Sequence, residues 1–160
     1  MTNPSPRETE SLSGFLVVET RADRPGYVRV YPTRETPSAP SADEPDTDAD
    51  SPHPRLRYAA AFPALHVAGM HAQTALHRSI VDAESGLFRA DPVVAAAAVE
   101  AIDLAHRRLY LDPKIAADPR FARLVDQRHA RQRLYDRIWT LVGILAILVL
   151  ILFSQIPVFF

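Results

Sequence analysis

The sequence of 160 residues contains no cysteine. Disulfide bonds, thiolate metal sites and cysteine nucleophiles are therefore excluded, and a reducing compartment is allowed. Lysine is nearly absent too, because Lys114 is the only one.

The net charge is −1, and no basic stripe with interleaved aromatic residues occurs, which argues against a nucleic-acid partner. Residues 1–13 lack the apolar core of a signal peptide, and we expect them to be disordered.

Charged residues are also missing from the last 23 positions, residues 138–160. The first part of this segment is apolar all round, and its length matches the roughly 20 residues that a helix needs to cross hydrocarbon. We predict a transmembrane tail anchor over residues 138–156. Its candidate membrane residues are Ile138, Trp139, Gly143, Ala146, Leu150 and Phe153. The pair Gly143 and Ala146 forms one small-residue notch, which is a weaker association signal than a GxxxG motif.

Basic residues precede the span and none follows it. We predict a basic juxtamembrane helix over residues 119–137. Its candidate contacts to anionic headgroups are Arg128, Arg131, Arg133 and Arg137. The same residues also fit a solvated helix that only sets topology. The positive-inside rule then places residues 1–137 in the cytoplasm and the C-terminus at the far side of an inner membrane.

The N-terminal part predicts a β-hairpin within residues 14–31. Two runs of β-branched and aromatic residues, 15–20 and 27–31, flank the turn signal Asp-Arg-Pro-Gly. In the second run Tyr27, Arg29 and Tyr31 share one face of the strand. Aromatic and arginine side chains are typical interface anchors, so these three are the candidate partner surface.

Residues 32–54 predict a disordered acidic loop. The segment carries six prolines and six acidic residues, and it cannot bury enough apolar surface to offset the entropy of ordering. Residues 55–59 alternate in polarity and predict a third strand, because a lone hairpin is marginally stable.

We expect residues 55–118 to combine this strand with a helical hairpin, which gives an α+β fold. The first helix should run from Pro63 to about Glu84, near Gly86, and the second over residues 92–110, followed by a short turn at 113–117. The first helix carries an apolar stripe of Leu65, Ala68, Ala72, Leu76 and Ile80. Three Asp-Pro pairs, at 91–92, 112–113 and 118–119, predict helix starts.

Chemical motifs are sparse. His66, Met70, Gln73 and His77 fall on one predicted helical face and could in principle ligate haem or copper, but packing explains them better. Asp82 and Glu84 fit a hydrated helix end. We therefore predict no catalytic residue, no metal site and no cofactor.

These features predict a non-catalytic accessory, assembly or stabilising subunit of a larger inner-membrane complex, with integral membrane proteins as partners. The alternative is a membrane-tethered adaptor that recruits a soluble partner through its cytoplasmic domain and acidic loop. A redox carrier that uses His66, Met70 and His77 is a third and weaker hypothesis.

Overall fold

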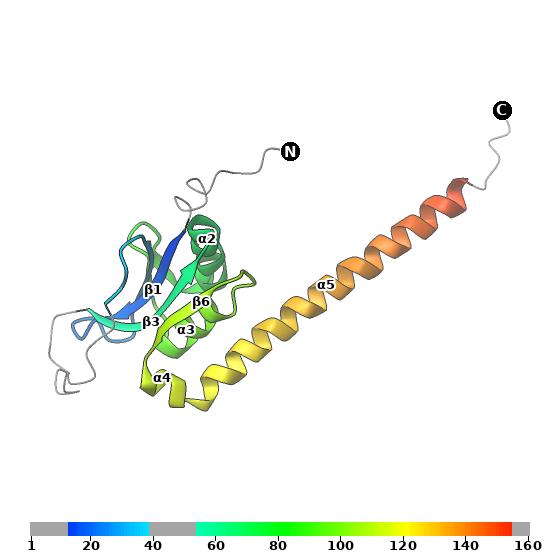
Figure 1. Ribbon diagram of the computed structural model, residues 1–160. Coiled ribbons are helices and arrows are strands. Elements are labelled where there is room, and N and C mark those ends of the chain that lie inside the picture. The colour runs from blue at the N-terminus through cyan, green and yellow to red at the C-terminus, as the bar shows by residue number, and fades with distance from the viewer. Residues whose placement is uncertain (1–12, 39–53, 155–160) are drawn as a thin grey trace. The chain divides into compact units, whose positions relative to one another are not determined.

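A computed structural model describes residues 13–38 and 54–154 of the chain (Figure 1). The chain divides into two compact units, residues 1–125 and residues 126–160. The elements in chain order are β1 (Gly14–Thr20), β2 (Val28–Thr33), β3 (Arg55–Phe62), α2 (Leu65–Leu76), the 3-10 turn η1 (His77–Ser79), β4 (Ile80–Asp82), β5 (Leu87–Phe88), α3 (Pro92–Glu100), β6 (Arg107–Leu111), α4 (Pro113–Ala117) and α5 (Pro119–Ser154). The protein is therefore α+β.

The strands form one antiparallel sheet in the order β4-β5-β2-β1-β3-β6. The predicted hairpin is confirmed as β1 and β2, with Val17 opposite Tyr31. The predicted third strand is confirmed as β3, which pairs with the other edge of β1. The sheet is larger than the predicted hairpin or meander, because β4, β5 and β6 extend it at both edges.

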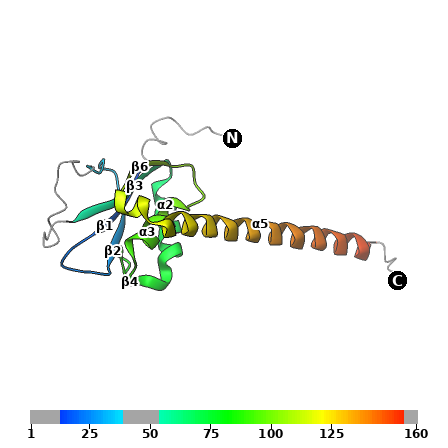
Figure 2. The ribbon, with the colours of Figure 1, turned by 90° about the horizontal axis from the view of Figure 1, so that it is seen from below.

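Helices α2 and α3 contact each other and both contact β1. In Figure 2 the central strands lie to one side of both helices, so α2 and α3 cover the same face of the sheet. Four consecutive alanines of α3, residues 95–98, are buried. Such small side chains let a helix approach its neighbours closely, and the core between helices and sheet is filled by larger side chains such as Tyr58, Phe62 and Phe88.

The prediction of a first helix to Glu84 is wrong beyond residue 76. Ala68, Ala72 and Leu76 of the predicted stripe are buried on α2, but Ile80 belongs to β4. Gly86 adopts a φ of 66°, and it makes the turn between β4 and β5 instead of ending a helix. A Cβ at Gly86 would lie 2.2 Å from the carbonyl oxygen of Val30, so only glycine fits this turn.

The prediction of a helix over residues 92–110 is wrong in its second half. Helix α3 ends at Glu100, and residues 107–111 form β6, which pairs with β3. The predicted helical hairpin is thus interrupted by strands on both sides of α3. The Asp112-Pro113 pair already disfavours a helical conformation at residue 112, and an extended approach to it suits a strand.

All three predicted Asp-Pro helix starts are confirmed. The Oδ1 atoms of Asp91, Asp112 and Asp118 each accept a hydrogen bond of 2.8 Å from the backbone amide two residues later. Proline at the first helical position lacks the amide hydrogen that would have no partner there. The segment predicted as a turn at 113–117 is the short helix α4.

The predicted loop 32–54 begins too early, because Pro32 and Thr33 belong to β2. Proline is tolerated there, since β5 pairs only with Val28 and Arg29 and no described strand pairs with the outer edge of β2 at Pro32. The acidic run lies in residues 39–53, outside the described residues, as do residues 1–12 of the predicted disordered N-terminus.

Candidate functional site

Arg29 and Tyr31, two of the three candidate partner residues, lie on the sheet face opposite α2 and α3. This face, called the open face below, carries a second apolar cluster made of strand residues only: Phe15, Val17, Tyr31, Leu56, Ala59 and Tyr110. Val17 and Ala59 are buried at its centre, and the aromatic rings are partly buried around them. The open face therefore carries partly exposed aromatic rings packed around small buried side chains.

Tyr31 and Arg29 hold each other in place on this face. The Arg29 guanidinium carbon lies 4.6 Å from the centre of the Tyr31 ring, and the Tyr31 hydroxyl donates to Glu19 Oε1 at 2.7 Å. Arg29 Nε also donates to the Ser85 carbonyl at 3.0 Å. Burial and the hydrogen bond to Glu19 raise the pKa of Tyr31 to about 12. Tyr27 precedes β2 and is half-buried.

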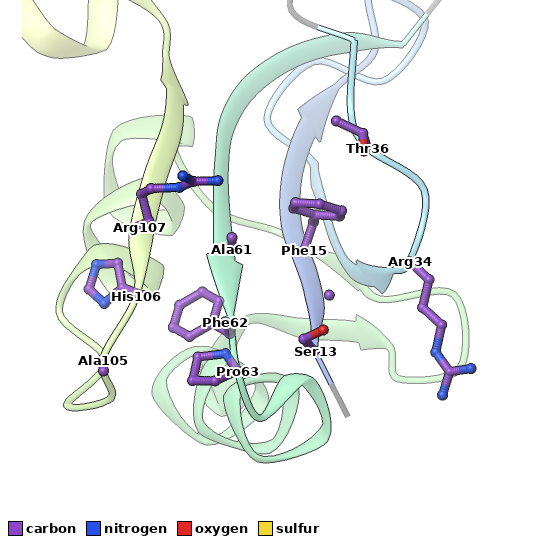
Figure 3. Close-up of a pocket in the computed structure, with 11 residues that line it drawn as sticks. Ser13, Phe15, Arg34, Thr36, Ala61, Phe62, Pro63, Ala105, His106 and Arg107 are labelled. Carbon is purple, nitrogen blue, oxygen red and sulfur yellow. The ribbon is translucent and has the colours of Figure 1, made fainter. Parts of the chain in front are cut away.

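A cavity of about 720 Å³ opens where β1 begins and β3 ends (Figure 3). Its lining includes two arginines, Arg34 and Arg107, together with His106, and none of the described lining residues is a carboxylate. Apolar surface comes from Phe15, Phe62 and several small residues. In Figure 3 the Arg107 side chain extends from β6 toward Ala61 of β3, whereas the Arg34 side chain extends away from Arg107.

His106 is fixed at the wall of this cavity. Its ring stacks on Phe62 with centroids 5.0 Å apart, and Nδ1 lies 2.8 Å from the Leu104 carbonyl oxygen. Because a carbonyl only accepts, Nδ1 carries the hydrogen. Nε2 lies 4.0 Å from Glu100 Oε2, too far for a hydrogen bond.

Glu100 joins α3 to the sheet behind His106. Its carboxylate accepts from the Tyr58 hydroxyl at 2.7 Å and from the Arg108 guanidinium. Burial alone would raise the pKa of Glu100, but the hydrogen bonds from Arg108 and Tyr58 outweigh it and the pKa is lowered. Burial and the bond to Glu100 raise the pKa of Tyr58. The carboxylate is thus held ionised by two fixed donors.

A second charged group lies at the other end of β3. Asp112 is buried, and its Oδ2 accepts from Arg57 Nη1 at 2.5 Å. Arg57 Nε donates to Thr20 Oγ1 at 2.7 Å. This arrangement links β1, β3 and the start of α4.

Only three of the four residues predicted to share one helical face, His66, Met70 and Gln73, lie together in the structure. His66, Met70 and Gln73 line a separate cavity of about 120 Å³ against the apolar residues Leu16, Val30 and Phe88. His77 lies beyond it in η1, and its Nδ1 pairs with the Thr74 carbonyl. Within residues 13–38 and 54–154, no three His, Cys, Asp or Glu side chains gather in a group that could hold a metal ion.

Asp82 and Glu84 lie in the turn between β4 and β5 and not at a helix end. Asp82 accepts from the Glu84 amide and from Ser85 Oγ, at 3.0 and 2.6 Å. The Ser85 hydrogen bond chiefly lowers the pKa of Asp82. This geometry shapes a turn.

In the described part of the chain, α5 is the one helix long and apolar enough to cross a membrane. Every residue from 138 to 151 is exposed, including Ile138, Trp139, Gly143, Ala146 and Leu150. The side chain of Phe153 lies outside the described ones. Among the basic candidates, Arg131, Arg133 and Arg137 are exposed and Arg128 is half-buried, with Arg131 placed 5.9 Å from the Tyr135 ring centre.

The cavity lined by Arg107 and His106 was not predicted from the sequence. The sequence pattern predicts a helix over residues 92–110, which would separate Arg107 from Ala61. A local signal was present, because Leu-Tyr-Leu before an Asp-Pro pair suits an extended segment.

Comparison with protein-family models, with curated proteins and with solved structures gives no match for this chain.

Proposed function

We propose that this protein is a single-span membrane protein that acts as a non-catalytic accessory, assembly or stabilising subunit of a larger inner-membrane complex. The observation that carries the proposal is the continuous exposed apolar surface of α5 between residues 138 and 151. A soluble monomer rarely exposes a contiguous apolar patch of this kind, because water contact with apolar surface is unfavourable. Lipid and neighbouring membrane helices are the surroundings that suit it.

The proposed orientation places the α+β unit in the cytoplasm. It rests on the arginines that precede the apolar segment. Because the chain has no cysteine, a single Asp23→Cys variant in the exposed β1–β2 turn gives a clean label site. A membrane-impermeant maleimide should label it in inverted vesicles and leave it unlabelled in sealed right-side-out vesicles. The opposite pattern would contradict the orientation.

The contact to a membrane partner is proposed to use Arg29 and Tyr31 on the open face together with Tyr27, which precedes β2. Arg29 and Tyr31 are pre-positioned by their mutual contact and by Glu19 and Ser85. Side chains held in this way lose little entropy on binding, and tyrosine and arginine are enriched among hot spots.

The test is co-purification from mild detergent. The wild-type chain should recover the same integral membrane proteins repeatedly, and the pair of substitutions Tyr27→Ala and Tyr31→Ala should weaken that recovery by about 1 kcal/mol or more if these rings are hot spots. Tyr31→Phe is the matched control, since it keeps the ring and removes only the hydrogen bond to Glu19.

Unchanged recovery with both tyrosines replaced would remove this surface from the proposal. A wild-type chain that always purifies without membrane partners would overturn the accessory function. Recovery of a soluble partner under those conditions would support the adaptor function in its place.

A further inference from the structure

We infer that the 720 Å³ cavity lined by Arg107, His106 and Phe15 binds a small organic oxyanion, in which an anionic oxygen group is joined to an apolar body. This inference concerns a ligand site and does not depend on the proposed subunit role. The volume of the cavity lies within the range of small-molecule sites, which span about 300–1,000 Å³. The cavity belongs entirely to the α+β unit.

The pairing of the strand arginines sets Arg107 apart. Arg29 contacts Tyr31 and Ser85, Arg55 and Arg57 are paired with Asp112, and Arg108 is paired with Glu100. Among the arginines in the described strands, Arg107 alone has no side-chain hydrogen bond or ion pair with another described residue. Its guanidinium is exposed and extends over the small side chain of Ala61 (Figure 3).

The charge around Arg107 favours an anion. His106 and Arg34 also line the cavity, and none of the lining residues within 13–38 and 54–154 is a carboxylate. The Glu100 carboxylate, 4.0 Å from His106 Nε2, already accepts hydrogen bonds from Arg108 and Tyr58. A guanidinium presents its donors in a planar fork that matches the oxygens of carboxylates and phosphates.

The rest of the lining favours an apolar body next to the anionic group. Phe15 is half-buried on the open face, and Phe62 is stacked with His106 at the cavity wall. Ala61, Pro63 and Ala105 leave space between them because their side chains are short. Aromatic and apolar walls with a few placed polar groups are the usual construction of a ligand site.

The test is a titration of the full chain in nonionic detergent with phenyl phosphate at low salt, followed by calorimetry and by amide chemical shifts of Gly14, Ala61 and Ala105. We expect saturable binding that weakens as salt is added. Inorganic phosphate lacks the apolar body and benzyl alcohol lacks the charge, so both should bind more weakly.

Two arginine variants make the assignment specific. Arg107→Gln should weaken phenyl phosphate binding by about tenfold, the loss expected for a hydrogen bond to a charged group. Arg24→Gln is the matched control, because Arg24 is exposed in the β1–β2 turn and lies outside the cavity lining, and it should bind like the wild type. Both positions are exposed, and a folded amide spectrum of each variant confirms that the loss is local.

The same oxyanion chemistry occurs in soluble metabolites and in lipid headgroups. A second titration uses dihexanoyl phosphatidylglycerol, and stronger Arg107-dependent shifts than with phenyl phosphate would assign the site to a headgroup. The reverse order would assign it to a soluble anion. Absence of saturable binding with both probes, or equal binding by wild type and Arg107→Gln, would overturn the inference.

Discussion

Replacing Asp112 by alanine should destabilise the α+β unit more than any other removal of a helix cap. Asp112 accepts from the Lys114 amide at the start of α4 and from Arg57 at 2.5 Å, and its side chain is almost fully buried. Loss of an N-cap acceptor costs about 1 kcal/mol. Removing one partner of a fully buried ion pair costs about 3–5 kcal/mol, because the other charge is left without compensation.

The Arg57 side chain is 21% exposed, so water can partly solvate its guanidinium once Asp112 is gone. We therefore place the ionic loss below the fully buried range and expect about 3 kcal/mol in total for Asp112→Ala. Asp112→Asn keeps an oxygen for the Lys114 amide and removes only the charge, so it should cost less. Asp91→Ala removes the cap of α3, and its exposed pair with Arg120 adds little, so this control should cost about 1 kcal/mol.

The assay is urea unfolding of the full chain in nonionic detergent, followed by near-ultraviolet circular dichroism. Tyr58 is fully buried, so its signal reports packing of the unit. Equal losses for Asp112→Ala and Asp91→Ala would refute the reasoning, because the buried pair would then contribute nothing beyond the cap. A loss for Asp112→Asn as large as for Asp112→Ala would show that the cap oxygen is unimportant.

Two further predictions concern Glu100 and the turn glycines. The lowered pKa of Glu100 means that its contribution to stability is present above the ordinary glutamate pKa of about 4.3 and is lost as the pH falls through its folded value, so acid unfolding should be less steep in Glu100→Gln than in wild type. An acid transition of unchanged steepness would contradict this. Gly86→Ala should destabilise the protein well beyond the roughly 1 kcal/mol expected for Gly26→Ala, because both have positive φ but only Gly86 would bring a Cβ within 2.2 Å of a carbonyl oxygen. Equal urea midpoints for the two variants would show that the turn relaxes freely.

The sequence predicted those elements whose signals are local. The β1–β2 hairpin follows from two short runs around a turn, and the helix starts follow from Asp-Pro pairs whose side chains cap the next amide. Each of these needs only neighbouring residues. The exposed apolar stretch of α5 is equally local, since composition alone marks it.

The errors occur where pairing across the chain outweighs local preference. Residues 80–82 and 107–111 continue helical patterns in the sequence, yet each becomes an edge strand because a partner strand is available beside it. The cavity was missed for the same reason, because strand pairing brings its lining residues together. Arg107 meets Ala61 through the β3–β6 pairing, and Phe15 meets Ala61 through the β1–β3 pairing. No spacing in the sequence carries that information.

The start of α5 shows how an unbroken helix can serve two environments. The sequence predicted a basic helix over residues 119–137 directly before the apolar segment, and the structure has one helix from Pro119 to Ser154. Phe121 is buried in the main core, and Leu124 and Val125 pack against it. The first turns of α5 therefore pack against the α+β unit. Neither the Asp118 cap nor the arginines that follow it in the sequence predicted this packing. Because the buried ring of Phe121 and the exposed segment from residue 138 share one hydrogen-bonded backbone, we expect that lipid covering that segment would stabilise the same helix whose first turns pack against the core of the unit.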